Sequence, residues 1–296
     1  MKSLVLDLPE NFSFEENRRY LQRSTNECLL TIQNDKIYRA LAIGSTPLLV
    51  EISADRQTLT IRFLSPCQPE CDEEILAVER YIRDWFDMDT NLEPFYELAQ
   101  RDPLLKDPVS RFFGLRLMGI PDLFEALAWA IIGQQINLAF AYTLKRRLVE
   151  RFGTSIDWQG QKHWIFPKAE NIATLEVDEL TDLKMTVKKS EYLIDVARLI
   201  VNGEVSKEKL LASDFQSAEK TLLNIRGIGP WTANYVLMRC LRYHEAFPID
   251  DVGLQNALKA VLGKEKKPTK EEIRNYAAAW RNWESYATFY LWRILY

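Results

Sequence analysis

Two adjacent carboxylates, Asp250 and Asp251, are the residues of this chain best placed to do chemistry. They follow Pro248 and precede an apolar pattern that predicts a helix over residues 252–261. One carboxylate there is explained as the N-cap of the helix, but a second is less easily explained, because adjacent like charges repel. A carboxylate held at a helix start is also placed to face a developing positive charge.

A glycine-rich segment, Gly227-Ile228-Gly229, ends an apolar run, and Pro230 is favourable in the first turn of the helix predicted to follow. Two glycines one residue apart allow a sharp turn and a close approach to another molecule. The free amides at the start of the next helix carry the positive end of its dipole and suit a phosphate. For a bare pair of glycines, an ordinary turn between two helices is the better explanation, and the residues around the pair decide between the two.

The helix after this hairpin has two different faces. Ala233, Val236 and Leu237 begin an aliphatic stripe at helical spacing, whereas Trp231 and Tyr235 lie together on nearly the opposite face. Two interpretations stay open. The helix is buried on both sides, or the two aromatic rings form a wall against which a planar ligand stacks.

The cysteines and histidines of this sequence do not form the patterns expected of a metal site or a disulfide framework. Four cysteines make no disulfide framework, and Cys67-x3-Cys71 is a poor zinc half-site, so we expect free thiols in a reducing compartment. His163 and His244 stand in no metal-binding pattern, and we expect both to be exposed on the surface.

Composition and charge indicate a globular protein of two domains. The chain has 296 residues, of which 47 % are hydrophobic and 27 % charged. Its apolar stretches fall short of the ~18 residues of a membrane span, so a soluble cytoplasmic protein is expected. Residues 1–100 hold 10 Lys and Arg against 18 Asp and Glu, a net charge of −8, while residues 101–296 hold 28 against 24, a net charge of +4. This asymmetry favours two domains and weakly favours a phosphate partner for the second.

The elements that must position these residues differ along the chain. Residues 28–33 and 36–41 predict two strands joined by Asn34-Asp35, residues 48–52 and 59–63 predict two more, and Asp72 is expected to cap a following helix. Beyond a break near residue 90 we expect helices and no strand. We therefore predict a mixed α/β domain over residues 1–90 and a helical domain over residues 91–296.

Taken together, two segments of the chain resemble the helix-hairpin-helix superfamily of DNA glycosylases, and within it the alkylbase subfamily of the 3-methyladenine-DNA glycosylase II type. These segments are Ile225-Arg226-Gly227-Ile228-Gly229-Pro230-Trp231-Thr232-Ala233-Asn234-Tyr235 and Pro248-Ile249-Asp250-Asp251. Residues 128–136, 183–190 and 283–292 agree with the same subfamily. The resemblance covers about residues 110–296. Over residues 1–100 it is architectural, implying an α+β fold with a sheet like half of a TATA-binding protein.

The resemblance also implies roles for single residues. Asp251 matches the catalytic aspartate, and Asp250 is the neighbour that caps or supports it. The aromatic residues of the base pocket are matched by Trp231, Tyr235 and Trp292. Gly227 and Gly229 match the hairpin glycines whose amides hold the DNA backbone. Gln135 stands where the subfamily has a leucine wedge, and it has the volume to fill the gap left by a flipped base and would hydrogen-bond the orphaned partner base.

The implied reaction is the release of an alkylated, cationic purine from double-stranded DNA by a monomeric enzyme, leaving an abasic site. Extruding the base costs a few kcal/mol. Aromatic walls favour a cationic base by ~0.5–2 kcal/mol each. Relatives with lyase activity carry a lysine where Trp231 stands, and others bind an iron–sulfur cluster through four C-terminal cysteines, whereas Cys240 is the only cysteine beyond residue 71. We therefore expect no lyase step and no cofactor.

Two alternatives belong to other classes of protein. A helix-hairpin-helix module that binds DNA without catalysis would keep the hairpin, but it needs no acid beside aromatic residues. An unrelated helical enzyme of small metabolites would make the hairpin a coincidence and would show no affinity for duplex DNA.

Overall fold

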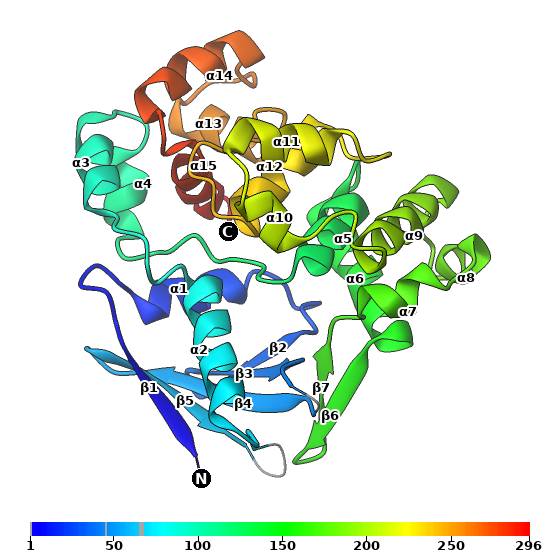
Figure 1. Ribbon diagram of the computed structural model, residues 1–296. Helices are drawn as coiled ribbons and strands as arrows, with labels where there is room; N and C mark the ends of the chain where they lie inside the picture. The colour runs from blue at the N-terminus through cyan, green and yellow to red at the C-terminus, as the bar shows by residue number, and fades with distance from the viewer. Residues whose placement is uncertain (1, 45, 65–67) are drawn as a thin grey trace.

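The computed structural model describes residues 2–44, 46–64 and 68–296. Its first third forms a five-stranded antiparallel sheet in the order β1-β5-β4-β3-β2 (Figure 1). The strands are β1 Ser3–Asp7, β2 Leu30–Gln33, β3 Lys36–Leu41, β4 Leu48–Ala54 and β5 Thr58–Phe63. The strands predicted from the sequence are therefore confirmed, with small changes of their ends.

The turn between β2 and β3 shows why the prediction of a tight hairpin succeeds. Asn34 and Asp35 have φ values of 49° and 60°, the left-handed backbone that a two-residue hairpin turn needs. Gln33 pairs with Lys36 directly beside the turn. Asparagine and aspartate adopt this conformation more readily than most side chains, so the turn fixes the register of the hairpin.

Helix α2, Asp72–Phe86, packs on the sheet and buries one apolar side. The predicted helix is confirmed, but its N-cap is Cys71, one residue before the predicted cap Asp72. Cys71 occupies the N-cap position without a side-chain hydrogen bond, and Asp72 is the first helical residue. Its carboxylate therefore interacts with the helix dipole and does not cap the backbone.

The rest of the chain is mainly helical, and it packs on the sheet through a shared core. The remaining helices are α1 Phe14–Leu21, α3 Glu93–Arg101, α4 Lys106–Arg111, α5 Leu123–Gly133, α6 Leu138–Phe152, α7 Ala169–Ala173, α8 Val177–Thr181, α9 Val187–Val201, α10 Lys207–Leu211, α11 Phe215–Leu223, α12 Pro230–Arg239, α13 Val252–Val261, α14 Lys270–Ala277 and α15 Glu284–Arg293, with a 3₁₀ turn, η1, at Ala278–Trp280.

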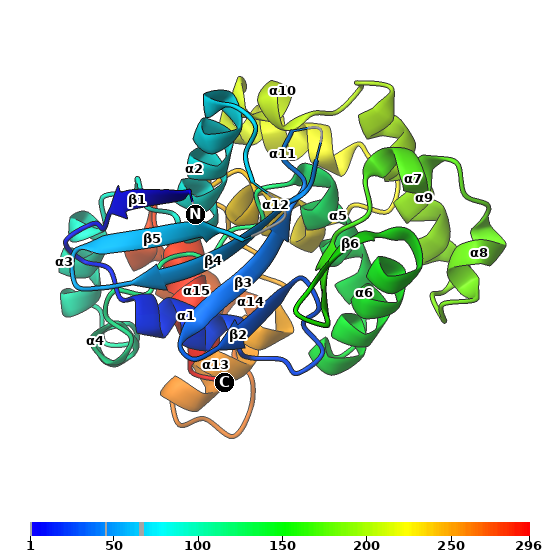
Figure 2. The ribbon, with the colours of Figure 1, turned by 90° about the horizontal axis from the view of Figure 1, so that it is seen from below.

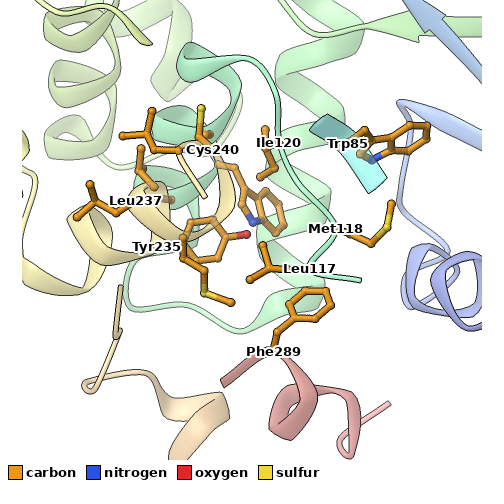
Figure 3. Close-up of a cluster of buried hydrophobic side chains, with 14 of the residues drawn as sticks. Trp85, Leu117, Met118, Ile120, Tyr235, Leu237, Cys240 and Phe289 are labelled. Carbon is orange, nitrogen blue, oxygen red and sulfur yellow. The ribbon is translucent and has the colours of Figure 1, made fainter. Parts of the chain in front are cut away.

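Helices from opposite ends of the chain meet in this core. The rings of Tyr20 on α1 and Phe289 on α15 lie 4.6 Å apart, and both views place α1 beside α15 (Figure 2). Figure 3 shows Trp85 of α2, Tyr235 of α12 and Phe289 of α15 in one buried cluster. The sheet and the helices therefore share one hydrophobic core. The predicted division at residue 90 falls between α2 and α3 and stays a prediction.

A second hairpin contradicts the expectation of no strands after residue 90. Strands β6 Thr154–Trp158 and β7 Gln161–Ile165 pair antiparallel around Gln159 and Gly160, both with positive φ. The Trp158 ring stacks on Tyr38 of β3 at 5.8 Å. Two short strands are marginal alone, so this hairpin depends on its contact with the first sheet, which no local pattern reveals.

The expectation that both histidines are exposed is wrong, and His163 is buried by the contact between the two sheets. His163 is only 4 % exposed, lies beside Tyr38 and Trp158, and has a pKa lowered by burial. His244 is half-buried and stacks on the ring of Trp283 at 4.7 Å. Burial lowers the pKa of His244 as well. Both imidazoles therefore pack as neutral rings.

Three of the four cysteines, Cys28, Cys71 and Cys240, are free thiols as predicted, and Cys67 lies outside the described residues. Burial raises the pKa of the Cys240 thiol to about 12. In the described part of the chain, no helix has the length and apolar character needed to cross a membrane.

Candidate active site and DNA-contacting loops

The predicted helix-hairpin-helix is formed by α11, α12 and the loop between them. Gly227 has a φ of 86°, and a Cβ atom there would overlap the Tyr192 ring, with Cδ1 2.7 Å away. Gly229 is the N-cap of α12, and a Cβ atom there would meet nothing within 4 Å. Gly227 is therefore required by backbone conformation and packing, whereas Gly229 presents an open approach to the start of α12.

Helix α9 supports this loop from one side. Arg226 pairs with Glu191 and, at 3.1 Å, with Asp195, and its guanidinium lies 5.4 Å from the centre of the Tyr192 ring. These pairs are solvent-exposed, so they contribute little to stability. Their effect is to orient the loop, because three side chains of one helix face contact two neighbouring residues of the hairpin.

Asp251 is the N-cap of α13 and accepts three hydrogen bonds. Its Oδ1 atom accepts from the backbone N–H of Leu254 at 2.7 Å and from Nε1 of Trp292 at 2.7 Å. Its Oδ2 atom accepts from Nε1 of Trp231 at 2.8 Å. The helix dipole and two indole donors therefore stabilise one fixed carboxylate.

Of the two roles expected for Asp250, capping the helix is wrong. The helix is capped by Asp251, so Asp250 is no cap, and its carboxylate forms an exposed ion pair with Lys270. Two neighbouring acids are tolerated because their side chains have different partners. Asp250 also lines a cavity of about 300 Å³ beside Trp231. Asp251, Tyr235 and Trp292 do not line that cavity.

The three predicted aromatic residues come together around Asp251. The ring centres of Trp231 and Tyr235 lie 5.6 Å apart, and those of Tyr235 and Trp292 lie 6.2 Å apart, with both pairs tilted by little more than 30°. Trp231 is half-buried, whereas Tyr235 and Trp292 are each 6 % exposed. Helix α12 is thus buried around most of its surface. Its Trp231 and Tyr235 form, with Trp292 of α15, an aromatic row beside the carboxylate.

Two residues that surround the aromatic row, Arg239 and Tyr20, were not predicted from the sequence. Arg239 donates from Nη1 to the Tyr235 hydroxyl at 3.0 Å and from Nε to the Met118 carbonyl at 2.7 Å. Tyr20 of α1 packs with its ring 5.7 Å from the same guanidinium. The spacing of Arg239 four residues after Tyr235 was an available signal, but nothing in the sequence near Tyr20 links it to α12.

Gln135 lies in the loop between α5 and α6. It is exposed and has a φ of 55°. A Cβ atom on Gly133, two residues earlier, would lie 3.8 Å from Cη2 of Trp231. The end of α5 is therefore next to the aromatic row, and the loop carries Gln135 to the surface close to it.

Comparison with known proteins identifies relatives over nearly the whole length of the chain. Residues 128–283 match the family model of the HhH-GPD superfamily base excision DNA repair protein, and residues 4–127 match the N-terminal domain of 8-oxoguanine DNA glycosylase. The chain is 53 % identical over 294 residues to DNA-3-methyladenine glycosylase of Bacillus subtilis, covering 99 % of this chain and 97 % of the relative.

More distant relatives share the fold. DNA-3-methyladenine glycosylase 2 of Escherichia coli is 29 % identical over 264 residues, which cover 88 % of this chain and 86 % of the relative. A solved 3-methyladenine DNA-glycosylase from Archaeoglobus fulgidus superposes with a TM-score of 0.85 at 24 % identity, over 98 % of this chain and 97 % of that one. The family match, the near full-length relative and the hairpin beside Asp251 agree, and the chain belongs to the HhH-GPD superfamily of base excision DNA repair proteins.

Proposed function

We propose that this DNA glycosylase hydrolyses the N-glycosidic bond of alkylated purines that have been flipped out of duplex DNA, leaving an abasic site. The observation that carries the proposal is the position of Asp251, a single carboxylate held by Trp231 and Trp292 at the start of α13. Purines alkylated at N3 or N7 carry positive charge and leave readily, so the reaction needs little proton donation to the base.

In this proposal Asp251 faces the sugar as the glycosidic bond breaks. Positive charge develops on the sugar, and a fixed carboxylate stabilises it without having to reorganise. The three donors hold the carboxylate in one orientation, which supports an electrostatic role. The same group then accepts the proton of the attacking water.

The base would stack against Trp231, Tyr235 and Trp292. Because Tyr235 and Trp292 are nearly fully buried, neighbouring side chains must move aside when a purine enters. Flat aromatic surfaces bind a purine by stacking and attract a cationic one more strongly.

The DNA contacts of the proposal are the amides at Gly227 and Gly229 for a backbone phosphate and Gln135 for the gap in the duplex. Support comes from the open start of α12 and from the exposed position of Gln135. We infer a monomer that acts in the cytoplasm, consistent with free thiols and with a basic helical part.

The proposal is tested with a panel of duplex oligonucleotides. Each carries 3-methyladenine, 7-methylguanine, hypoxanthine or ethenoadenine, and the released bases are identified by chromatography. We expect release of at least one methylated purine under single-turnover conditions. Duplex binding without release from any member of the panel would instead identify a non-catalytic DNA-binding protein.

We expect the reaction to stop at an intact abasic site. The indole of Trp231 is no useful nucleophile, and an exposed lysine with a pKa near ~10.4 is almost wholly protonated at neutral pH. Borohydride should trap no covalent complex, and the product strand should break only after treatment with alkali. A trapped adduct, or a nick formed at the rate of base release, would contradict this prediction.

Two substitutions at Trp292 separate its ring from its N–H group. Trp292→Phe keeps an aromatic wall but removes a donor to a charged acceptor, so we expect base release to fall about tenfold, or more. Trp292→Ala removes the wall as well and should slow the release of cationic 3-methyladenine more than that of neutral hypoxanthine. Single-turnover rates on both bases, with melting temperatures as a folding check, measure the difference. Equal rates for Trp292→Phe and the unmodified protein would show that the indole N–H has no role.

A further inference from the structure

We propose that Gln134 is a positioning residue that couples the loop carrying Gln135 to the hairpin that holds the DNA backbone. This inference rests on the proposed function, since it assigns a step in base extrusion. It concerns the residue next to the wedge position, whose side chain points back into the protein, whereas Gln135 is exposed.

The side chain of Gln134 bridges two parts of the helix-hairpin-helix. Its Nε2 atom donates to the Gly227 carbonyl at 2.9 Å and to Oγ1 of Thr232 at 3.0 Å. Gly227 lies in the hairpin and Thr232, only 2 % exposed, lies in the first turn of α12. Both hydrogens of the amide are used, so the orientation of the side chain is fixed.

The backbone of Gln134 connects this bridge to the wedge loop. Gln134 is the C-cap of α5, and Gln135, the next residue, has the left-handed φ of 55°. A non-glycine residue holds that conformation at a cost, so its surroundings must stabilise it. The hydrogen bonds of Gln134, one residue away, provide that support.

A second side chain, Lys189, also holds the end of α5. Nζ of Lys189, on α9, donates to the Ile132 carbonyl at 2.7 Å. Lys189 is buried and forms no ion pair with the described residues, and burial lowers the pKa of its amine. Its hydrogen bond satisfies a free carbonyl in the last turn of α5.

These contacts place the hairpin and the wedge loop in one unit. When the hairpin amides bind a phosphate, Gln135 is held at a set distance along the duplex. The wedge then enters at the base step next to the bound phosphate. Without the bridge, phosphate binding would continue, but insertion would lose its register with the flipped base.

The test compares Gln134→Met with Gln100→Met, the same substitution at an exposed glutamine of α3, far from the hairpin in both ribbon views. Gln134→Glu is a second variant, which keeps the shape but places a carboxylate oxygen against the Gly227 carbonyl, so that an acceptor meets an acceptor, while the Thr232 hydroxyl can still donate to it. Single-turnover release of a methylated purine is measured in a normal duplex and opposite an abasic-site analogue, where the lesion is already unpaired. The salt dependence of duplex binding is measured in parallel.

We expect both Gln134 variants to lose about tenfold in rate on the normal duplex and less than threefold on the unpaired lesion, with an unchanged salt dependence and with Gln100→Met unaffected. Equal losses on the two substrates would show a merely structural role and overturn the inference, as would no loss on either. If the unmodified protein releases no base at all, the proposed function itself is wrong.

Discussion

Asp251→Asn should lower the single-turnover rate of base release by about 10³-fold or more, while duplex binding stays equal or becomes slightly tighter. Asparagine still caps α13, so the fold is kept. If its amide oxygen continues to accept from Leu254 and Trp292, its NH₂ group faces the indole N–H of Trp231, and a donor then meets a donor. The variant therefore loses both the negative charge and the bond that orients Trp231.

The neighbouring acid provides the control for this experiment. Asp250→Asn removes only an exposed ion pair with Lys270 and leaves the cap of α13 intact. We expect its rate of base release to change less than about fivefold, because such pairs contribute at most about 1 kcal/mol. An inactive Asp250 variant together with an active Asp251 variant would reverse the assignment of the two carboxylates.

Gly227→Ala should destabilise the protein by about 2–4 kcal/mol and weaken duplex binding about tenfold or more, whatever the DNA sequence. At this position alanine would have to adopt a left-handed backbone with a φ of 86°, and its Cβ atom would overlap the Tyr192 ring. The loop must move to relieve the overlap, and its amides then leave their positions. Chemical denaturation and binding titrations measure the two effects.

Gly229→Ala is the matched control for the same loop. Its φ is −92° and the space around it is empty, so we expect its stability to change by less than about 1 kcal/mol. Its methyl group would still project into the approach to α12, so binding should fall. In Gly227→Ala, removing the ring with Tyr192→Ala should restore part of the lost stability. A fully stable Gly227→Ala variant would show that the loop has an alternative conformation.

The part of the site that could be predicted is the part that is close in sequence. Trp231, Tyr235 and Asp251 lie on consecutive elements, and their spacing, with the family resemblance, was enough to place them together. Trp292 came from the resemblance alone. The indole partners of Asp251 were not predicted, because an indole N–H that reaches a carboxylate depends on how α12 and α15 pack against the start of α13.

The failures have the same origin in long-range packing. Strands β6 and β7 are short, and β7 packs on β3, more than a hundred residues earlier. His163 was expected on the surface because imidazole is polar, yet the two sheets bury it. Tyr20 and Arg239 meet only because α1 packs on the helices of the last third. The sequence places Gln134 next to Gln135, but the two acceptors of its side chain lie about a hundred residues away along the chain.

Helix α15 follows the other elements of the site in the chain, and almost all of its side chains are buried in the shared core. Translation produces the sheet, α12 and the start of α13 before it produces α15, so the other residues of the site exist before Trp292 is made and before the core that fixes them is complete. Until then Asp251 lacks one of its indole donors, and Tyr20 lacks the ring of Phe289. A nascent chain, or one cut before residue 292, is therefore expected to release no base, because it lacks Trp292 and the end of the helix that completes the core.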